Sequence, residues 1–232
     1  MINQMPLSIP IVSSIPSISS ILRDGLLFDP KNWMTLMSKP DINQILETID
    51  RLFKSLNDRQ IPYVLVGGVA MLSYIKGRNT QDVDLIMDRA DGVAIGLLIS
   101  SENKDFAQAD YDGVRVDLLL NKNKLFKKIQ KEYSQAVQWG EHSVTTATPE
   151  GLVILKLYAL PSLYRQGEFD RAAIYETDIL QLALNYQLKL ELLLKLVKPH
   201  VIESDLEELG TIVQDIQGRL RRMERNRPSL SD

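Results

Sequence analysis

The stretch VGGVAMLSYIKGRNTQDVDLIM, residues 66–87, joins two adjacent glycines to two aspartates that stand one residue apart in an apolar run. Side chains alternate along a β-strand, so Asp82 and Asp84 are predicted to project from the same face. Two carboxylates held side by side repel each other, and a bound cation, usually a metal ion, relieves that repulsion. The other interpretation is an edge strand whose inward charges prevent aggregation.

The composition limits which chemistry is available to such a site. The chain has 232 residues, of which 44% are hydrophobic and 25% charged, as is ordinary for a globular protein. It contains no cysteine, and its two histidines, His142 and His200, are far apart in sequence, which argues against thiolate chemistry and zinc sites built on these residues. Any metal is therefore expected to have oxygen ligands. No signal peptide or membrane span is recognised, so we expect a cytoplasmic protein without a membrane partner.

Basic residues are concentrated at two places although the net charge is −3. One group lies in a predicted helix and the other near the C-terminus; the residues are Lys122, Lys124, Lys127, Lys128 and Lys131, and Arg219, Arg221, Arg222, Arg225 and Arg227. Such groups form either a solvated helix face and a frayed tail, or a surface that attracts phosphates.

The hydrophobic pattern divides the chain into three parts: an N-terminal arm at 1–40, a mixed α/β domain at 41–148 and a helical domain at 149–232. In the second part we predict a helix at 41–56, strands within 62–68, 81–87 and 112–120, a basic helix at 123–132 and two short strands after it. Residues 69–77 are predicted to form a short helix after the glycines, and 88–104 a variable link. Leu-rich segments around 149–160, 169–186, 188–198 and 203–225 predict the C-terminal helices.

A third carboxylate belongs to the same pattern. Asp117 lies in the strand predicted within 112–120, on one face with Arg115 and Leu119. If this strand lies beside the one that carries Asp82 and Asp84, the three carboxylates have the composition of a two-magnesium site for attack on phosphorus.

These residues resemble a known family. The run GGVAMLSYIKGRNTQDVDL is similar to the glycine-rich turn and Asp-x-Asp signature of the DNA polymerase β-like nucleotidyltransferase superfamily. It looks most like the bacterial nucleotidyltransferase toxins (AbiEii class) of type IV toxin–antitoxin and abortive-infection systems. The resemblance covers residues 41–184, with Lys156 in TPEGLVILKLYAL and Asp178 in IYETDILQL. It implies an α/β core with a mixed sheet, followed by a helical C-terminal domain.

The resemblance also implies roles for single residues. Asp82, Asp84 and Asp117 would bind two Mg²⁺ ions, with Mn²⁺ as an alternative, and act in catalysis together with Lys156 and Asp178. Nucleotide contacts would come from five residues: Gly67, Gly68, Arg78, Thr80 and Lys156. Arg78 and Thr80 also suit ordinary turn chemistry, which is the other interpretation of these two residues. Relatives carry a run of charged residues just before the position of Asp178. In this chain Arg165, Asp170 and Arg171 remain alternatives for the residue that corresponds to that run.

Lys156 stands in a segment that is apolar nearly all round, so its charge needs a partner. The ammonium could snorkel to the helix edge, contact nucleotide phosphates or approach the carboxylates. Asp178 could instead pair with Arg171 or cap a turn. If Lys156 faces only a ligand, replacing it by Met is expected to preserve stability or raise it.

The implied activity is transfer of NMP from an NTP to an acceptor hydroxyl. By resemblance the acceptor is the tRNA 3′ end, and an antitoxin protein is the expected partner. One alternative is transfer to a small molecule, as in antibiotic-modifying relatives, or to a protein side chain. A second alternative is an inactive member of the fold that acts as a binding module.

Overall fold

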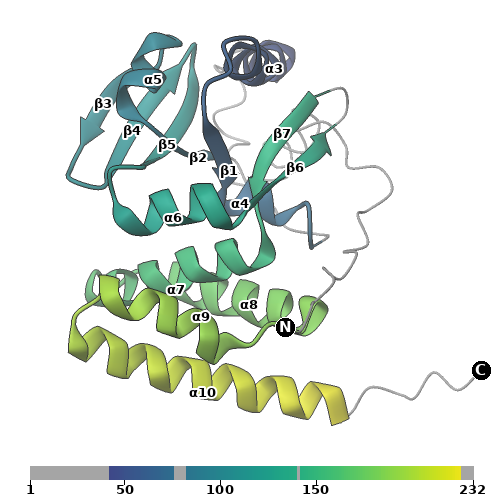
Figure 1. Cartoon of the computed structure of the whole chain (residues 1–232), viewed down its shortest axis with the longest axis vertical. Helices are drawn as coiled ribbons and strands as arrows, with labels where there is room; N and C mark the ends of the chain where they lie inside the picture. Colours follow the sequence, from purple (N-terminus) through teal and green to yellow (C-terminus); the bar gives the residue numbers. More distant parts are fainter. Residues whose placement is uncertain (1–41, 76–81, 140–141, 226–232) are drawn as a thin grey trace, which may run out of the picture.

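A seven-stranded sheet forms the first half of the described chain, and helices follow it (Figure 1). The computed structural model describes residues 42–75, 82–139 and 142–225. The elements up to the last strand are α3 (Ile42–Asp58), β1 (Tyr63–Val66), α4 (Gly67–Met71), β2 (Val83–Met87), α5 (Arg89–Ala94), β3 (Leu98–Glu102), β4 (Phe106–Tyr111), β5 (Val114–Leu120), α6 (Lys124–Glu132), β6 (Ser134–Trp139) and β7 (His142–Ala147). Helices α7 (Pro149–Arg165), α8 (Phe169–Tyr186), α9 (Leu190–Val197), η1 (Lys198–His200) and α10 (Glu203–Arg225) complete it. The expected fold class, a mixed sheet followed by helices, is confirmed.

The sheet is mixed, and its order is β3-β4-β5-β2-β1-β7-β6. Strand β2 pairs antiparallel with β1 and parallel with β5, while β1 is parallel to β7. The two central strands are apolar almost throughout, and every residue of β1 is buried. Strands covered on both faces have this composition because neither face meets water. Strand β2 is central, so the edge-strand interpretation of Asp82 and Asp84 is wrong.

The segment 88–104, expected to be a variable link, contains α5 and β3, and β4 follows it. These two strands form one end of the sheet, where β3 is mostly exposed and the only fully buried residues of β4 are Ala107 and Ala109. Alanine has a low strand propensity, and polar residues surround these two. The sequence pattern was therefore too weak to predict the hairpin.

Helix α7 packs between the sheet and the remaining C-terminal helices (Figure 1). It begins at Pro149, and the hydroxyl of Thr148 accepts a hydrogen bond from the Gly151 amide at 3.3 Å, an ordinary N-cap arrangement. A Cβ at Gly151 would lie 2.8 Å from the Tyr133 carbonyl oxygen, so only glycine fits there without a shift. No helix in the described part of the chain is long and apolar enough to cross a membrane.

The glycine turn differs in detail from the prediction. Helix α4 includes both glycines and ends at Met71, so it starts earlier and is shorter than expected. Gly67 has φ +66°, in the left-handed region that favours glycine. The chain can therefore turn sharply from β1 into α4 directly beside β2.

Candidate active site

A cavity of about 680 Å³ is lined by residues of both the sheet and the C-terminal helices. On the sheet side, residues from the β1–α4 turn and from β2, β4 and β5 contribute, and on the helical side residues from α7, α8, η1 and the start of α10. This volume is in the range of small-molecule and nucleotide pockets.

Asp84 and Asp117 lie side by side on the sheet wall of the cavity. The register of the parallel pair β2–β5 places their Cα atoms opposite each other, and both residues line the cavity. Asp82 directly precedes β2 and is half-buried. The prediction that the strand of Asp117 lies beside that of Asp84 is confirmed.

The pKa of Asp84 responds to the charges of the neighbouring side chains. Its pKa is raised from 3.8 to about 7, first by burial and then by the negative charges of Asp117 and Asp82. The positive charges of Lys156 and Arg171 oppose that shift. The carboxylates therefore destabilise one another when all are ionised, as expected for carboxylates held side by side.

Gly67 leaves the space that Asp84 occupies. A Cβ at Gly67 would overlap the Oδ2 atom of Asp84, so any other residue there would displace the carboxylate. Because the left-handed φ also favours glycine, both the backbone and the neighbouring side chain restrict this position.

Lys156 forms a buried ion pair with Asp178. Its Nζ lies 2.7 Å from Asp178 Oδ2, and the two residues are only 4% and 5% exposed. The Nζ also lies 4.2 Å from the ring centroid of Tyr175, a cation–π distance. Lys156 lines the cavity, so snorkelling to the helix edge is wrong, and its partner is Asp178.

Tyr175 was missed by the sequence analysis. Arg171, Tyr175 and Asp178 follow one another at spacings of four and three residues, so they form one stripe of α8. This stripe faces Lys156 on α7, and the charged residues at its two ends were the signal that could have identified it.

Of the three alternatives for the upstream charged role, Arg165 and Arg171 line the cavity, whereas Asp170 is exposed. Arg165 forms an ion pair with Asp205 at 2.5 Å, and the Arg171 guanidinium lies 5.9 Å from the Tyr175 ring. Arg171 also lowers the pKa of Asp84, so it is the one whose charge reaches the carboxylates.

The predicted site residues do not all reach the cavity. Gly67, Asp84, Asp117 and Lys156 line it. Gly68 is buried within α4. Asp82 raises the pKa of the lining residue Asp84, and Asp178 pairs with the lining residue Lys156. Arg78 and Thr80 lie outside the described residues.

Three aromatic rings also line the cavity. The Phe126 ring makes edge contacts with Phe106 and Tyr158, with centroids 5.4 and 5.7 Å apart. All three rings line the cavity, and Phe106 is 40% exposed. These rings can contact a planar or apolar group.

The donor set suits a hard divalent cation. Asp84 and Asp117 present carboxylates, which Mg²⁺ and Mn²⁺ prefer, and Gly67 leaves room at Asp84. Within the ranges 42–75, 82–139 and 142–225, however, no three acidic or histidine side chains converge closely enough to hold an ion. The carboxylate ligands are therefore of the type that Mg²⁺ and Mn²⁺ prefer, and a side-chain rearrangement would have to complete the coordination of the ion.

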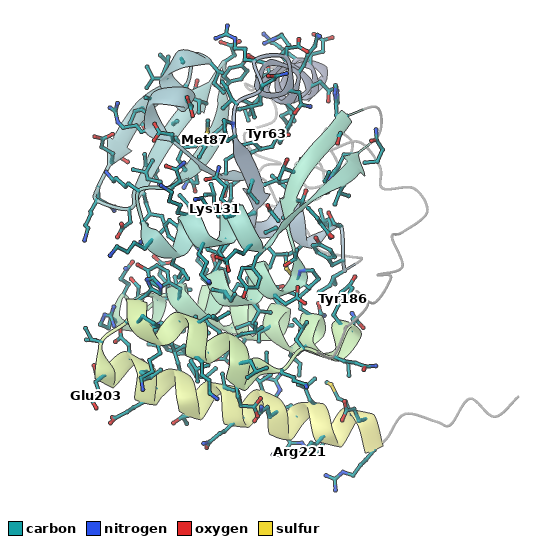
Figure 2. The ribbon with its side chains drawn as sticks, in the orientation of Figure 1. Tyr63, Met87, Lys131, Tyr186, Glu203 and Arg221 are labelled. Atoms are coloured by element: carbon teal, nitrogen blue, oxygen red, sulfur yellow. The ribbon has the colours of Figure 1, made fainter. Side chains whose placement is uncertain are left out.

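Basic residues occupy two separate surfaces, as Lys131 on α6 and Arg221 on α10 illustrate (Figure 2). The lysines of α6 are largely exposed, although Lys128 pairs with Glu132 at 2.6 Å. His200 lines the cavity and lies within electrostatic reach of α6. Its pKa is lowered by burial and by the positive charges of Lys124 and Lys128. Arg227 lies outside the described residues.

Comparison with known proteins gives similarity at the level of structure only. No protein-family model and no curated protein matches the sequence. The solved structures include a nucleotidyltransferase-like protein from Paracoccidioides brasiliensis, with 15% identity, TM-score 0.48, and coverage of 89% of this chain and 94% of that one. They also include the antibiotic-resistance factor ANT(2'')-Ia in solution, with 13% identity, TM-score 0.47, and coverage of 80% and 99%. A crystal structure of ANT(2'')-Ia with adenylyl-2''-tobramycin has 14% identity, TM-score 0.44, and coverage of 74% and 95%. The functional argument therefore depends on this chain's own residues.

Proposed function

We propose that this chain is a metal-dependent nucleotidyltransferase, which moves NMP from an NTP to an acceptor hydroxyl. The supporting observation is the pair of Asp84 and Asp117 on adjacent parallel strands, in one cavity with the buried cation of Lys156. Carboxylates on one wall and a fixed cation on the other suit a triphosphate, because positioning and charge stabilisation provide most of the catalysis of phosphoryl and nucleotidyl transfer.

Asp84, Asp117 and Asp82 would hold Mg²⁺ or Mn²⁺. When bound, the metal supplies Lewis-acid stabilisation of charge on the phosphate oxygens. Lys156 provides a second, preorganised positive charge, and Asp178 and Tyr175 keep its ammonium at the cavity wall. Gly67 brings the backbone close to Asp84, and the carboxylate of Asp84 occupies the space that a side chain at position 67 would fill.

For the acceptor we propose the 3′ end of tRNA, with the protein acting in the cytoplasm as a toxin under control of an antitoxin. The family resemblance of residues 41–184 supports this proposal, as do the lysines of α6 near the cavity residue His200. The charged residues that line the cavity are balanced, so they favour neither an anionic acceptor nor a cationic drug. Among the described residues four carboxylates line it, from Asp84, Asp117, Glu168 and Asp205, against the cations of Arg115, Lys156, Arg165 and Arg171. We also propose that residues 149–232 form a helical domain that supplies the second wall.

The test is incubation of the purified protein with each α-labelled NTP and Mg²⁺, in separate reactions with total tRNA, tobramycin or no acceptor. Label in tRNA that requires Asp84 and Asp117 supports the proposal. Label in tobramycin supports the small-molecule alternative, and label in the protein itself supports transfer to a side chain. Absence of label in every reaction, with intact binding of NTP, would indicate the inactive binding module.

A further inference from the structure

Arg115 engages both carboxylate oxygens of Asp117. Its Nε donates a hydrogen bond to Oδ1 at 3.1 Å, and its Nη2 donates one to Oδ2 at 2.9 Å. The two residues stand two apart on β5, so their side chains project from the same face. Such two-point pairing of a guanidinium with a carboxylate is stronger and more directional than a single contact.

This pair lies inside the cavity. Arg115 and Asp117 both line it, and the Asp117 side chain is 21% exposed. The charges of Asp82 and Asp84 also act on Arg115 and, with Asp117, raise its pKa, opposed by partial burial. Arg115 is therefore the cation that pairs directly with Asp117, while Lys156 and Arg171 act on Asp84.

A metal ion would need the oxygens that Arg115 occupies. Arg115 uses one lone pair of each Asp117 oxygen, and its positive charge beside the carboxylate opposes the approach of a cation. Asp84 and Asp117 are neighbours, so a cation at Asp117 would meet the charge of Arg115 as well as that of Asp84.

We propose that Arg115 is a positioning residue that competes with the metal for Asp117 and thereby sets the metal affinity of the site. This inference rests on the proposed function in that it assumes a divalent cation at Asp84 and Asp117. With Arg115 in place, the negative charge of Asp117 is partly compensated and the site binds metal more weakly. Metal binding is favoured when the guanidinium moves away from Asp117.

The experiment measures Mn²⁺ binding without NTP, from the free Mn²⁺ signal in electron paramagnetic resonance, for the full chain and its variants. We expect Arg115→Met to bind Mn²⁺ more tightly, by at least about threefold, because a competing positive charge is removed from a partly exposed site. Arg115→Lys keeps the charge but cannot bond both oxygens in the same plane, so its affinity should lie between the two. Arg89→Met, which breaks the exposed ion pair with Glu102, is the matched control and should bind as the parent does.

A merely structural role for Arg115 predicts the opposite sign, because an unsupported Asp117 would bind metal less well. Equal or weaker Mn²⁺ binding by a folded Arg115→Met protein would overturn the inference. If that variant does not fold, Arg115→Lys decides by the same criterion against the parent.

The labelled transfer assay keeps this inference separate from the proposed function. Transfer by the parent, without tighter Mn²⁺ binding in the Arg115 variants, refutes the inference alone. Tighter Mn²⁺ binding in Arg115→Met, in a protein that transfers no nucleotide, refutes the proposed function and supports the inference.

Discussion

The buried pair of Lys156 and Asp178 allows stability and chemistry to be measured separately. Replacement of Lys156 by Met keeps most of the volume of the stem but removes the ammonium that pairs with the Asp178 carboxylate, in a site only 5% exposed. Removing one member of a buried ion pair commonly costs about 3–5 kcal/mol. For a chain of this length that corresponds to a fall in Tm of roughly 6–20 °C.

The structure thus reverses the expectation that Lys156→Met preserves stability, which assumed that the ammonium faces only a ligand. The matched double variant, Lys156→Met with Asp178→Leu, removes both charges and should regain most of the lost stability. Replacing a buried ion pair by apolar residues of similar volume is often neutral or stabilising. Two single variants and the double variant, unfolded in urea, form a double-mutant cycle that isolates the interaction of the pair.

Nucleotide transfer should not recover with stability. If Lys156 stabilises charge on the triphosphate, both Lys156→Met proteins should lose about a hundred- to a thousandfold in single-turnover rate. The reasoning fails if Lys156→Met is as stable as the parent, or if the double variant is no more stable than the single one. Recovery of transfer in the double variant would remove Lys156 from the chemistry.

Three other residues give further predictions. Asp84→Asn should abolish transfer and should raise the Tm at pH 8 but hardly at pH 4. The folded-state pKa of about 7 exceeds the unfolded value of 3.8, so the cost of ionising Asp84 in the folded protein grows as the pH rises from about 4 to about 7 and is complete above 7. An unchanged Tm at pH 8, measured by calorimetry, contradicts this prediction. Gly67→Ala should reduce both transfer and Tm, because the new Cβ meets the Asp84 carboxylate. The control is Gly113→Ala, at φ +87° with open space around it, which should cost only about 1–2 kcal/mol of backbone strain and leave transfer intact. Similar transfer by the two variants would disprove the contact between position 67 and Asp84. Tyr175→Leu should slow transfer by about two- to thirtyfold, because the cation–π contact with Lys156 is worth about 0.5–2 kcal/mol. Tyr175→Phe should retain most of the rate, and equal rates for Leu and Phe would show that the ring face is not needed.

The parts of the fold that could be predicted were those with a strong period or an unbroken apolar run. Strands β2 and β5, carrying Asp84 and Asp117, and the long helices α8 and α10 lie where the pattern placed them. The hairpin of β3 and β4 was missed because its inward positions are alanines and its edge is polar. Short polar strands at a sheet end obtain their stability from pairing, which a local pattern does not show.

Side-chain partners were harder to predict than elements. Lys156 was known to need a partner, yet the choice of Asp178 depends on how α7 packs against α8. The shared face of Arg115 and Asp117 was visible from their spacing, but spacing alone does not show whether the guanidinium turns toward Asp117 or toward a ligand. Both outcomes are set by tertiary packing and by the neighbouring charges.

The contact at Gly151 has a genetic consequence. Gly151 fixes how closely the first turn of α7 approaches the Tyr133 carbonyl, and Lys156 is five residues further along the same helix. A side chain at position 151 would push that turn outward and move the ammonium away from the opposite wall of carboxylates. If expression of the protein arrests growth, survivors should therefore carry substitutions at Gly151 as well as at Asp84 and Asp117. The Gly151 alleles should be conditional on temperature, because they displace the helix but leave the carboxylates themselves unchanged.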